Sequence, residues 1–170
     1  RSLVEEILPG ELKLAKPATN PAASDLHPVA YLYGRPTNTS WIISNTPIII
    51  GPNYQELMLL VPFVQRKPSG TLWHNYVVRM YLDDWNAIYI GNLFFGYAKR
   101  WGTSQESGTQ VTAFVAKTPY FHADIRTTGP WLSSAQAKKA VPNYEAIQTI
   151  LAMPIVGRTS AGTLVCSYFE

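Results

Sequence analysis

A chain of 170 residues lies within the roughly 100 to 200 residues of one domain, so we expect a single hydrophobic core. Apolar residues make up 46% of the sequence and aromatic residues 12%, which excludes a disordered chain. The net charge of +3 comes without any long run of like charge, so we expect no nucleic-acid partner. The single cysteine, Cys166, excludes an internal disulfide framework and a cysteine-rich metal site.

Hydropathy indicates where the protein resides. No apolar run approaches the roughly 20 residues that cross a bilayer, so we expect no membrane partner and a cytoplasmic location. The chain begins at Arg1 rather than Met, which leaves an upstream targeting segment open. Charged residues are only 15% of the chain, which favours a surface partly covered by other subunits and hence a homo-oligomer.

The first 28 residues differ in pattern from the rest. Four aliphatic side chains recur at helical spacing after Ser2, a potential N-cap, and Pro9-Gly10 ends the pattern. The segment from Glu11 to Pro28 is rich in proline and alanine, which predicts an extended arm. We therefore assign residues 1–28 to a helix and arm, and residues 29–170 to a single domain.

From Val29 onward, short segments rich in β-branched and aromatic residues alternate with Pro and Gly clusters, which predicts a sheet. The predicted strands are Val29–Tyr33, Trp41–Ser44, Pro47–Ile50, Gln55–Val64, Leu72–Leu82, Ala87–Ile90, Tyr97–Trp101, Gln110–Ala116, Tyr120–Arg126 and Leu164–Phe169. Turn chemistry at Pro68-Ser69-Gly70 predicts a hairpin between the two longest strands, and Thr118-Pro119 separates a second pair.

Two helices are predicted late in the chain. Ser133 or Ser134 can cap Ala135–Ala140, and Pro142-Asn143 can open Tyr144–Met153. An apolar stripe along the second helix predicts that it covers one side of the sheet. The expected class is therefore α+β, mostly antiparallel β with a few flanking helices.

Several common reaction classes lack support in the sequence. There is no glycine-rich phosphate loop, no His-Glu-x-x-His and no Gly-x-Ser-x-Gly. The three histidines, His27, His74 and His122, are scattered, and isolated histidines on strands are more often structural than metal ligands. We therefore do not expect a metal site at these histidines.

Lys99 is the first candidate for chemistry, because it follows the apolar stretch Leu93–Phe95 and precedes Arg100. A lysine is nucleophilic only as the neutral amine, and both desolvation and a neighbouring cation lower its pKa. Adjacent side chains in a strand point to opposite faces, so in a strand Arg100 would contribute less. The alternative for these two residues is a pair of solvated cations.

Glu56 is the second candidate. In a strand it would share one face with Met58 and Leu60, while Leu57 and Leu59 would lie on the other. A glutamate in this position is either an outward-facing charge or an enclosed carboxylate. Apolar neighbours on its own face favour the enclosed carboxylate.

A wider stretch around these residues resembles the acetoacetate decarboxylase family. The residues that carry the resemblance to its segment ending in Gly-x-Pro-Lys-Lys are Met80–Asp83, Ala87–Ile88, Gly91 and Gly96–Arg100. Tyr54-Gln55-Glu56, followed by Pro62, is similar to the family's Tyr-x-Glu-x5-Pro element. Ala98 and Arg100 replace the motif's proline and second lysine, and Asn92-Leu93 stands where Arg-Glu is common.

The resemblance implies a Schiff-base decarboxylase for a small or medium 3-oxo acid such as acetoacetate. Lys99 would form the imine, Arg100 would keep the second positive charge, and Glu56 would act as an acid/base or polarising group. Acetoacetate decarboxylase is itself the general example of a lysine activated by a neighbouring cation. The family further implies a partly barrel-like antiparallel sheet, no metal or cofactor, a large homo-oligomer, and residues beyond Glu170.

Three matters stay open in the sequence. The substrate carboxylate needs a cationic partner, for which the candidates are Arg35, Arg79 and Arg126. The enamine chemistry could be that of an aldolase or dehydratase instead of a decarboxylase. A noncatalytic domain of the same fold that binds a carbonyl compound or an apolar ligand is the alternative from another class.

Overall fold

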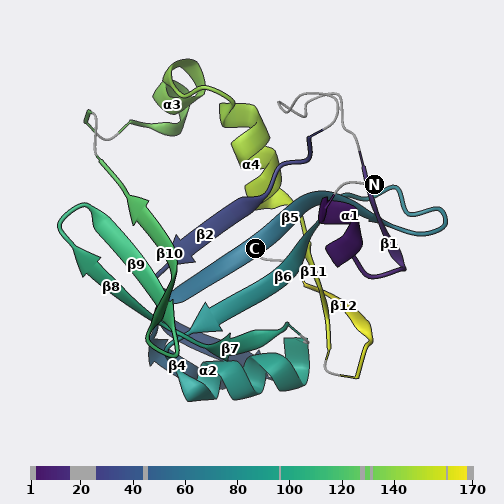
Figure 1. Ribbon diagram of the computed structural model, residues 1–170, viewed down its shortest axis with the longest axis horizontal. Coiled ribbons are helices and arrows are strands. Elements are labelled where there is room, and N and C mark those ends of the chain that lie inside the picture. The colour runs from purple at the N-terminus through teal and green to yellow at the C-terminus, as the bar shows by residue number, and fades with distance from the viewer. Residues whose placement is uncertain are drawn as a thin grey trace.

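The computed structural model describes residues 3–15, 26–43, 46–95, 97–126, 129–130, 132–159 and 161–167. These residues form a seven-stranded sheet, a three-stranded sheet and a two-stranded sheet, with helices around them (Figure 1). Most strand pairs are antiparallel, which confirms the predicted α+β class. Among the described strands, none of the three sheets closes into a barrel.

The centre of the fold is the antiparallel hairpin of β5 (Glu56–Arg66) and β6 (His74–Leu82). The predicted turn lies between the two strands, as the sequence indicated. Along its outer edge β5 pairs first with β2 (Ala30–Gly34) and then with β1 (Leu12–Leu14). β1 therefore belongs to the main sheet, although an extended arm was predicted there.

The far edge of β6 carries two parallel partners. The first half of β6 pairs with β11 (Ile155–Arg158), and its end pairs with β7 (Lys99–Trp101). β12 (Leu164–Ser167) follows β11 as an antiparallel neighbour. A strand that runs parallel to its predecessor needs a crossover, so the chain must leave the sheet between β6 and β7.

That crossover is helical. It consists of α2 (Trp85–Ile90) and the π-helical segment η1 (Gly91–Phe95). The prediction of a strand over Ala87–Ile90 is therefore wrong, because these residues belong to α2. Asp84 is the helix N-cap, and its carboxylate accepts the backbone N–H of Ala87 at 2.7 Å.

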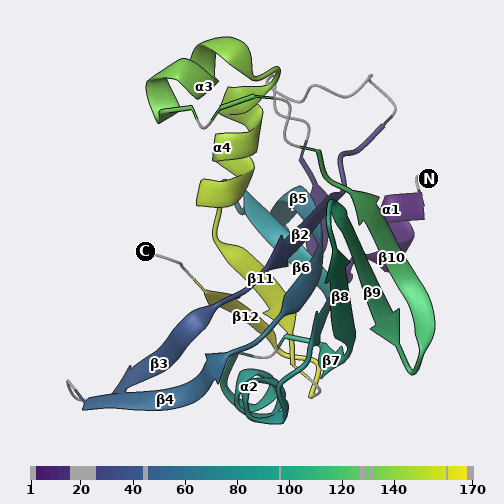
Figure 2. The ribbon, with the colours of Figure 1, turned by 90° about the vertical axis from the view of Figure 1, so that its left-hand side faces the viewer.

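Figure 2 shows the two smaller sheets extending to different sides of the hairpin. β8 (Thr103–Ser107), β9 (Gln110–Val115) and β10 (Thr118–Asp124) form the three-stranded sheet, and β3 (Thr37–Ile43) pairs with β4 (Thr46–Asn53). The β9–β10 turn lies at residues 116–117, both with positive φ, so the turn predicted at Thr118-Pro119 is two residues too late.

Three further helices lie around the central sheet. α1 (Leu3–Ile7) matches the predicted N-terminal helix, whose expected cap, Ser2, lies outside the described residues. Of the two serines predicted as caps, Ser133 is the N-cap of α3 (Ser134–Ala140), and it forms a capping box with Gln136. α4 (Tyr144–Ala152) packs Ile150 beside Phe63, but much of its predicted apolar stripe stays exposed.

The apolar core occupies both faces of the β5–β6 hairpin. One face packs Leu60, Met80 and Leu82 under α2, and the other packs Val61 and Val64 beside β1 and β11. Among the described residues, no helix combines the length and the apolar character that crossing a bilayer requires. The α2 face is the one that receives the candidate lysine.

Candidate active site

Strand register brings Lys99 and Glu56 to the same face of the central sheet. Glu56 is the register partner of Leu82 on β6, and Lys99 is the partner of Met80. Register partners point to the same side, and so do residues two apart in one strand. The two candidates from distant parts of the sequence therefore face the space beneath α2.

The Lys99 side chain runs along the crossover that precedes it. Its amine donates to the backbone carbonyl of Ala87 in α2 at 3.5 Å. A Cβ added to Gly91 would lie 2.3 Å from Lys99 Nζ and 2.4 Å from its Cε. The lysine therefore occupies the space that a side chain at Gly91 would fill, and glycine is needed there for close approach.

Burial changes the ionisation of both candidates. It lowers the pKa of Lys99, and the nearby Glu56 carboxylate counters this shift only in part. Burial also raises the pKa of Glu56, again countered in part by the Lys99 charge. Desolvation therefore shifts both groups toward their neutral forms, and the neutral amine is the nucleophilic form of lysine.

Asn92 fixes the backbone of Lys99. Its side-chain oxygen accepts the Lys99 N–H at 3.0 Å, and its side-chain nitrogen donates to the Lys99 carbonyl at 3.1 Å. The amide thus acts as an additional strand partner for the first residue of β7. The sequence offered Asn92 only as a departure from the family pattern, and its role is visible only in the fold.

We expect Asn92→Ala to lower the free energy of unfolding by about 1 to 3 kcal/mol, because two hydrogen bonds to Lys99 are lost together. Denaturant unfolding of the variant and the wild type measures the difference. Asn53→Ala is the matched control, because Asn53 is exposed. Equal losses in the two variants would contradict the assigned role of Asn92.

Arg100 does not accompany Lys99 into this space. It is the register partner of Tyr81, so it lies on the opposite face of the sheet, and it is exposed. Burial, rather than an adjacent guanidinium, is therefore the physical cause of the lowered Lys99 pKa. The next residue, Trp101, stacks on Trp85 at a centroid distance of 4.9 Å and ties the start of α2 to β7.

The three arginines suggested for a substrate carboxylate are engaged elsewhere. Arg35 pairs with Glu106 at 2.8 Å and Arg126 pairs with Asp124 at 2.9 Å. Arg79 lies on the face opposite Lys99, where it donates to the Tyr81 hydroxyl at 3.5 Å. In the part of the chain that the structure describes, none of the three forms a contact with Lys99 or Glu56 that would define a carboxylate site.

Comparisons with known proteins bear on the fold. No protein family matches the chain by sequence, and no curated protein does so either. An acetoacetate decarboxylase from Legionella pneumophila is structurally similar over 98% of this chain and 58% of its own, with a TM-score of 0.61 and 16% identity. A second acetoacetate decarboxylase matches over 96% of this chain and 57% of its own, with a TM-score of 0.58 and 17% identity.

A third similar structure is MppR, an enzyme of enduracididine biosynthesis solved with the condensation product of pyruvate and imidazole 4-carboxaldehyde. The similarity extends over 97% of this chain and 69% of the MppR chain, with a TM-score of 0.53 and 10% identity. The chain therefore has the acetoacetate decarboxylase-like fold that the sequence resemblance predicted. It spans less than three fifths of the two decarboxylases, and these similar folds belong to enzymes.

Proposed function

We propose that this chain is a lysine-dependent lyase that forms an imine between Lys99 and a small or medium 3-oxo acid such as acetoacetate. The observation that carries the proposal is the partly buried Lys99 amine, whose pKa is lowered by burial and which shares a face with Glu56. The similar folds of two acetoacetate decarboxylases support the choice of substrate class.

The steps that make and break bonds use the lysine and a proton donor. The neutral Lys99 amine adds to the ketone carbon, water leaves, and a protonated imine forms. The electron pair of the bond to the carboxylate moves into the imine as carbon dioxide departs. The resulting enamine takes a proton on carbon, and hydrolysis releases the ketone and restores the amine.

Glu56 is proposed as the proton donor and acceptor of these steps. A carboxyl whose pKa is raised by burial holds a proton closer to neutral pH than an exposed one. It can therefore donate to the leaving hydroxyl and later accept a proton from the attacking water. Its charge also acts on the lysine, since ionised Glu56 raises the pKa of Lys99.

We expect Glu56→Gln to have two separable effects on imine formation. The maximal rate should fall on the order of a hundredfold, because acid/base assistance is lost. The pH at which the rate rises should move lower, because removing the carboxylate removes the influence that raises the Lys99 pKa. Single-turnover rates measured across pH test both effects.

Glu106→Gln is the matched control, because Glu106 pairs with Arg35 rather than with the lysine. It should leave both the maximal rate and its pH dependence unchanged. A lower midpoint with an unchanged maximal rate would assign Glu56 an electrostatic role only and would contradict the acid/base role.

A second candidate function is aldol or dehydration chemistry on the same imine. One observation favours it: MppR, which has a similar fold, was solved with the condensation product of pyruvate and imidazole 4-carboxaldehyde. In that case the enamine would form by loss of a proton from the carbon beside the imine, and an aldehyde would then accept the new carbon–carbon bond.

Reduction with borohydride tests the proposal. The protein is incubated with acetoacetate, longer 3-oxo acids or pyruvate, reduced, and digested for peptide mass spectrometry. We expect a substrate-dependent adduct on the peptide that contains Lys99, with carbon dioxide released from the 3-oxo acids. An adduct without carbon dioxide would favour the second candidate. The lack of any adduct from folded protein would overturn both and favour a noncatalytic binding domain.

A further inference from the structure

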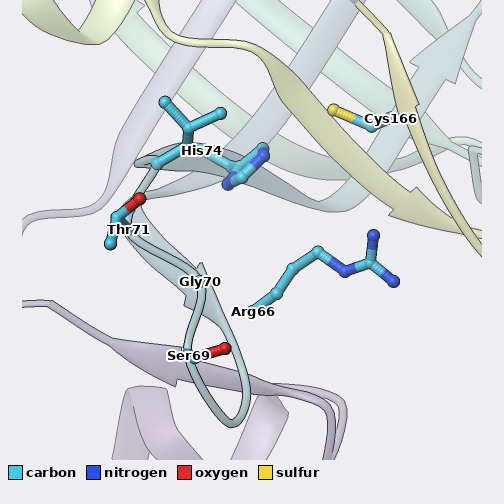
Figure 3. Close-up of a pocket in the computed structure, with 7 residues that line it drawn as sticks. Arg66, Ser69, Gly70, Thr71, His74 and Cys166 are labelled. Carbon is cyan, nitrogen blue, oxygen red and sulfur yellow. The ribbon is translucent and has the colours of Figure 1, made fainter.

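A cavity of about 350 Å³, with a lining that is part polar and part apolar, lies at the turn of the β5–β6 hairpin, remote from Lys99. The residues lining it include Arg66, Ser69, Thr71, His74 and Cys166, which Figure 3 shows around one opening. Arg66 and Glu56 stand at opposite ends of β5, on the order of 30 Å apart along the strand at about 3.3 Å per residue. The cavity is therefore separate from the candidate active site.

The strand register places the cavity's polar groups on one face. Val64 is the register partner of His74, and Arg66 follows Val64 by two residues, so Arg66 and His74 point to the same side. Cys166 comes from β12, which lies beyond β11 on the far side of β6. Two separate parts of the chain thus converge on the cavity.

His74 is the residue that points to a ligand. Its exposed fraction is 6%, and its Nδ1 is buried without a hydrogen-bond partner in the described part of the chain. A buried polar nitrogen without a partner costs free energy, which a group held in the cavity would recover. Rotation of the ring about χ2, a soft torsion, exchanges its two edges and can turn Nδ1 toward that group.

The chemistry of the lining selects an anion. Arg66 brings five N–H donors in a planar fork, which suits a carboxylate or a phosphate. Imidazole adds a sixth donor, and the hydroxyls of Ser69 and Thr71 lie in the turn beside them. None of the described residues that line the cavity is acidic, so nothing there competes with an anion for the guanidinium.

We propose that this cavity binds a small oxyanion, a carboxylate or a phosphate, with Arg66 and His74 as its principal donors. The guanidinium of Arg66 would hold two oxygens at the mouth of the cavity, and His74 would donate to an oxygen deeper inside. The site does not include Lys99, so anion binding can be tested whether or not the protein shows the proposed lyase activity.

Isothermal titration calorimetry with inorganic phosphate, and separately with acetate, tests the proposal at constant ionic strength. We expect saturable binding of one or both anions to the wild type, and affinity at least tenfold lower in Arg66→Gln. Arg66 is exposed, so this variant should fold. Lys67→Gln is the matched control. It also removes one positive charge, but the Lys67 side chain, next to Arg66 in the sequence, does not line the cavity.

The alkylation rate of Cys166, the single cysteine of the chain, reports whether the anion binds in this cavity. Cys166 is exposed at the cavity, so saturating anion should slow its alkylation by iodoacetamide, a neutral reagent, in the wild type and not in Arg66→Gln. Binding of phosphate alone, or of acetate alone, identifies the class of anion. No saturable binding of either anion, or equal affinity in Arg66→Gln and Lys67→Gln, would overturn the proposal.

Discussion

Lys99→Arg is expected to abolish the adduct that borohydride traps on the wild-type protein. Arginine keeps the positive charge and much of the length of lysine, but its guanidinium stays protonated at every accessible pH and cannot attack a ketone. The expected loss is complete at the detection limit of peptide mass spectrometry. Lys139→Arg, an exposed substitution on α3, is the matched control and should retain the full adduct.

The same lysine should leave a signature in stability that does not depend on any substrate. Because burial lowers the pKa of Lys99, the folded state binds fewer protons than the unfolded state between that lowered pKa and the ordinary value of 10.5. The free energy of unfolding therefore rises with pH across this window. In Lys99→Met the rise should disappear, and the variant should be more stable than the wild type at neutral pH.

Two results would contradict this account of Lys99. An adduct in Lys99→Arg equal to that of the wild type would move the imine to another amine. Parallel stability curves for the wild type and Lys99→Met through the alkaline window would mean that the amine is not desolvated. Denaturant unfolding at several pH values provides the second measurement.

The sequence predicted which side chains share the candidate site better than it predicted their local structure. Lys99 and Glu56 carry their signals in residue type and apolar context, and the structure places both on one face. Arg100 lies on the opposite face because side chains alternate along β7, as the predicted strand over Tyr97–Trp101 already indicated. Asn92 could not be recognised, because its two hydrogen bonds to Lys99 depend on the path of the crossover.

The error at α2 has a definite physical origin. The segment from Ala87 to Ile90 holds β-branched and aromatic residues that favour strands, and the six residues of α2 are too few to show a clear helical period. The Asp84 cap and the parallel placement of β7 decide the matter instead. The strands β1 and β11 were missed for a similar reason, since each is stabilised by pairing with a strand distant in sequence. The strand β8 was missed because all of its residues are polar, and it is stabilised by its hairpin with the next strand, β9.

Gly91→Ala is expected to slow imine formation at Lys99 while changing the free energy of unfolding little. The Gly91 backbone is right-handed helical, at φ −63° and ψ −39°, so alanine fits its conformation without strain. The new Cβ would, however, lie within 2.4 Å of Lys99 Nζ, Cδ and Cε. These atoms are the flexible end of a side chain, so the amine should move while the sheet stays folded.

Displacement of the amine by about 1 Å or more should reduce the rate of imine formation on the order of a hundredfold. Gly10→Ala is the control, because a Cβ there meets nothing within 4 Å. The double variant Gly91→Ala/Lys99→Ala separates steric displacement from damage to the crossover. If Lys99 is the only group that the new methyl displaces, adding Gly91→Ala to Lys99→Ala should cause no further loss of stability, since alanine favours a helix over glycine by about 1 kcal/mol. A further loss in the double variant would show that Gly91 is needed by the backbone of the crossover and not by the lysine.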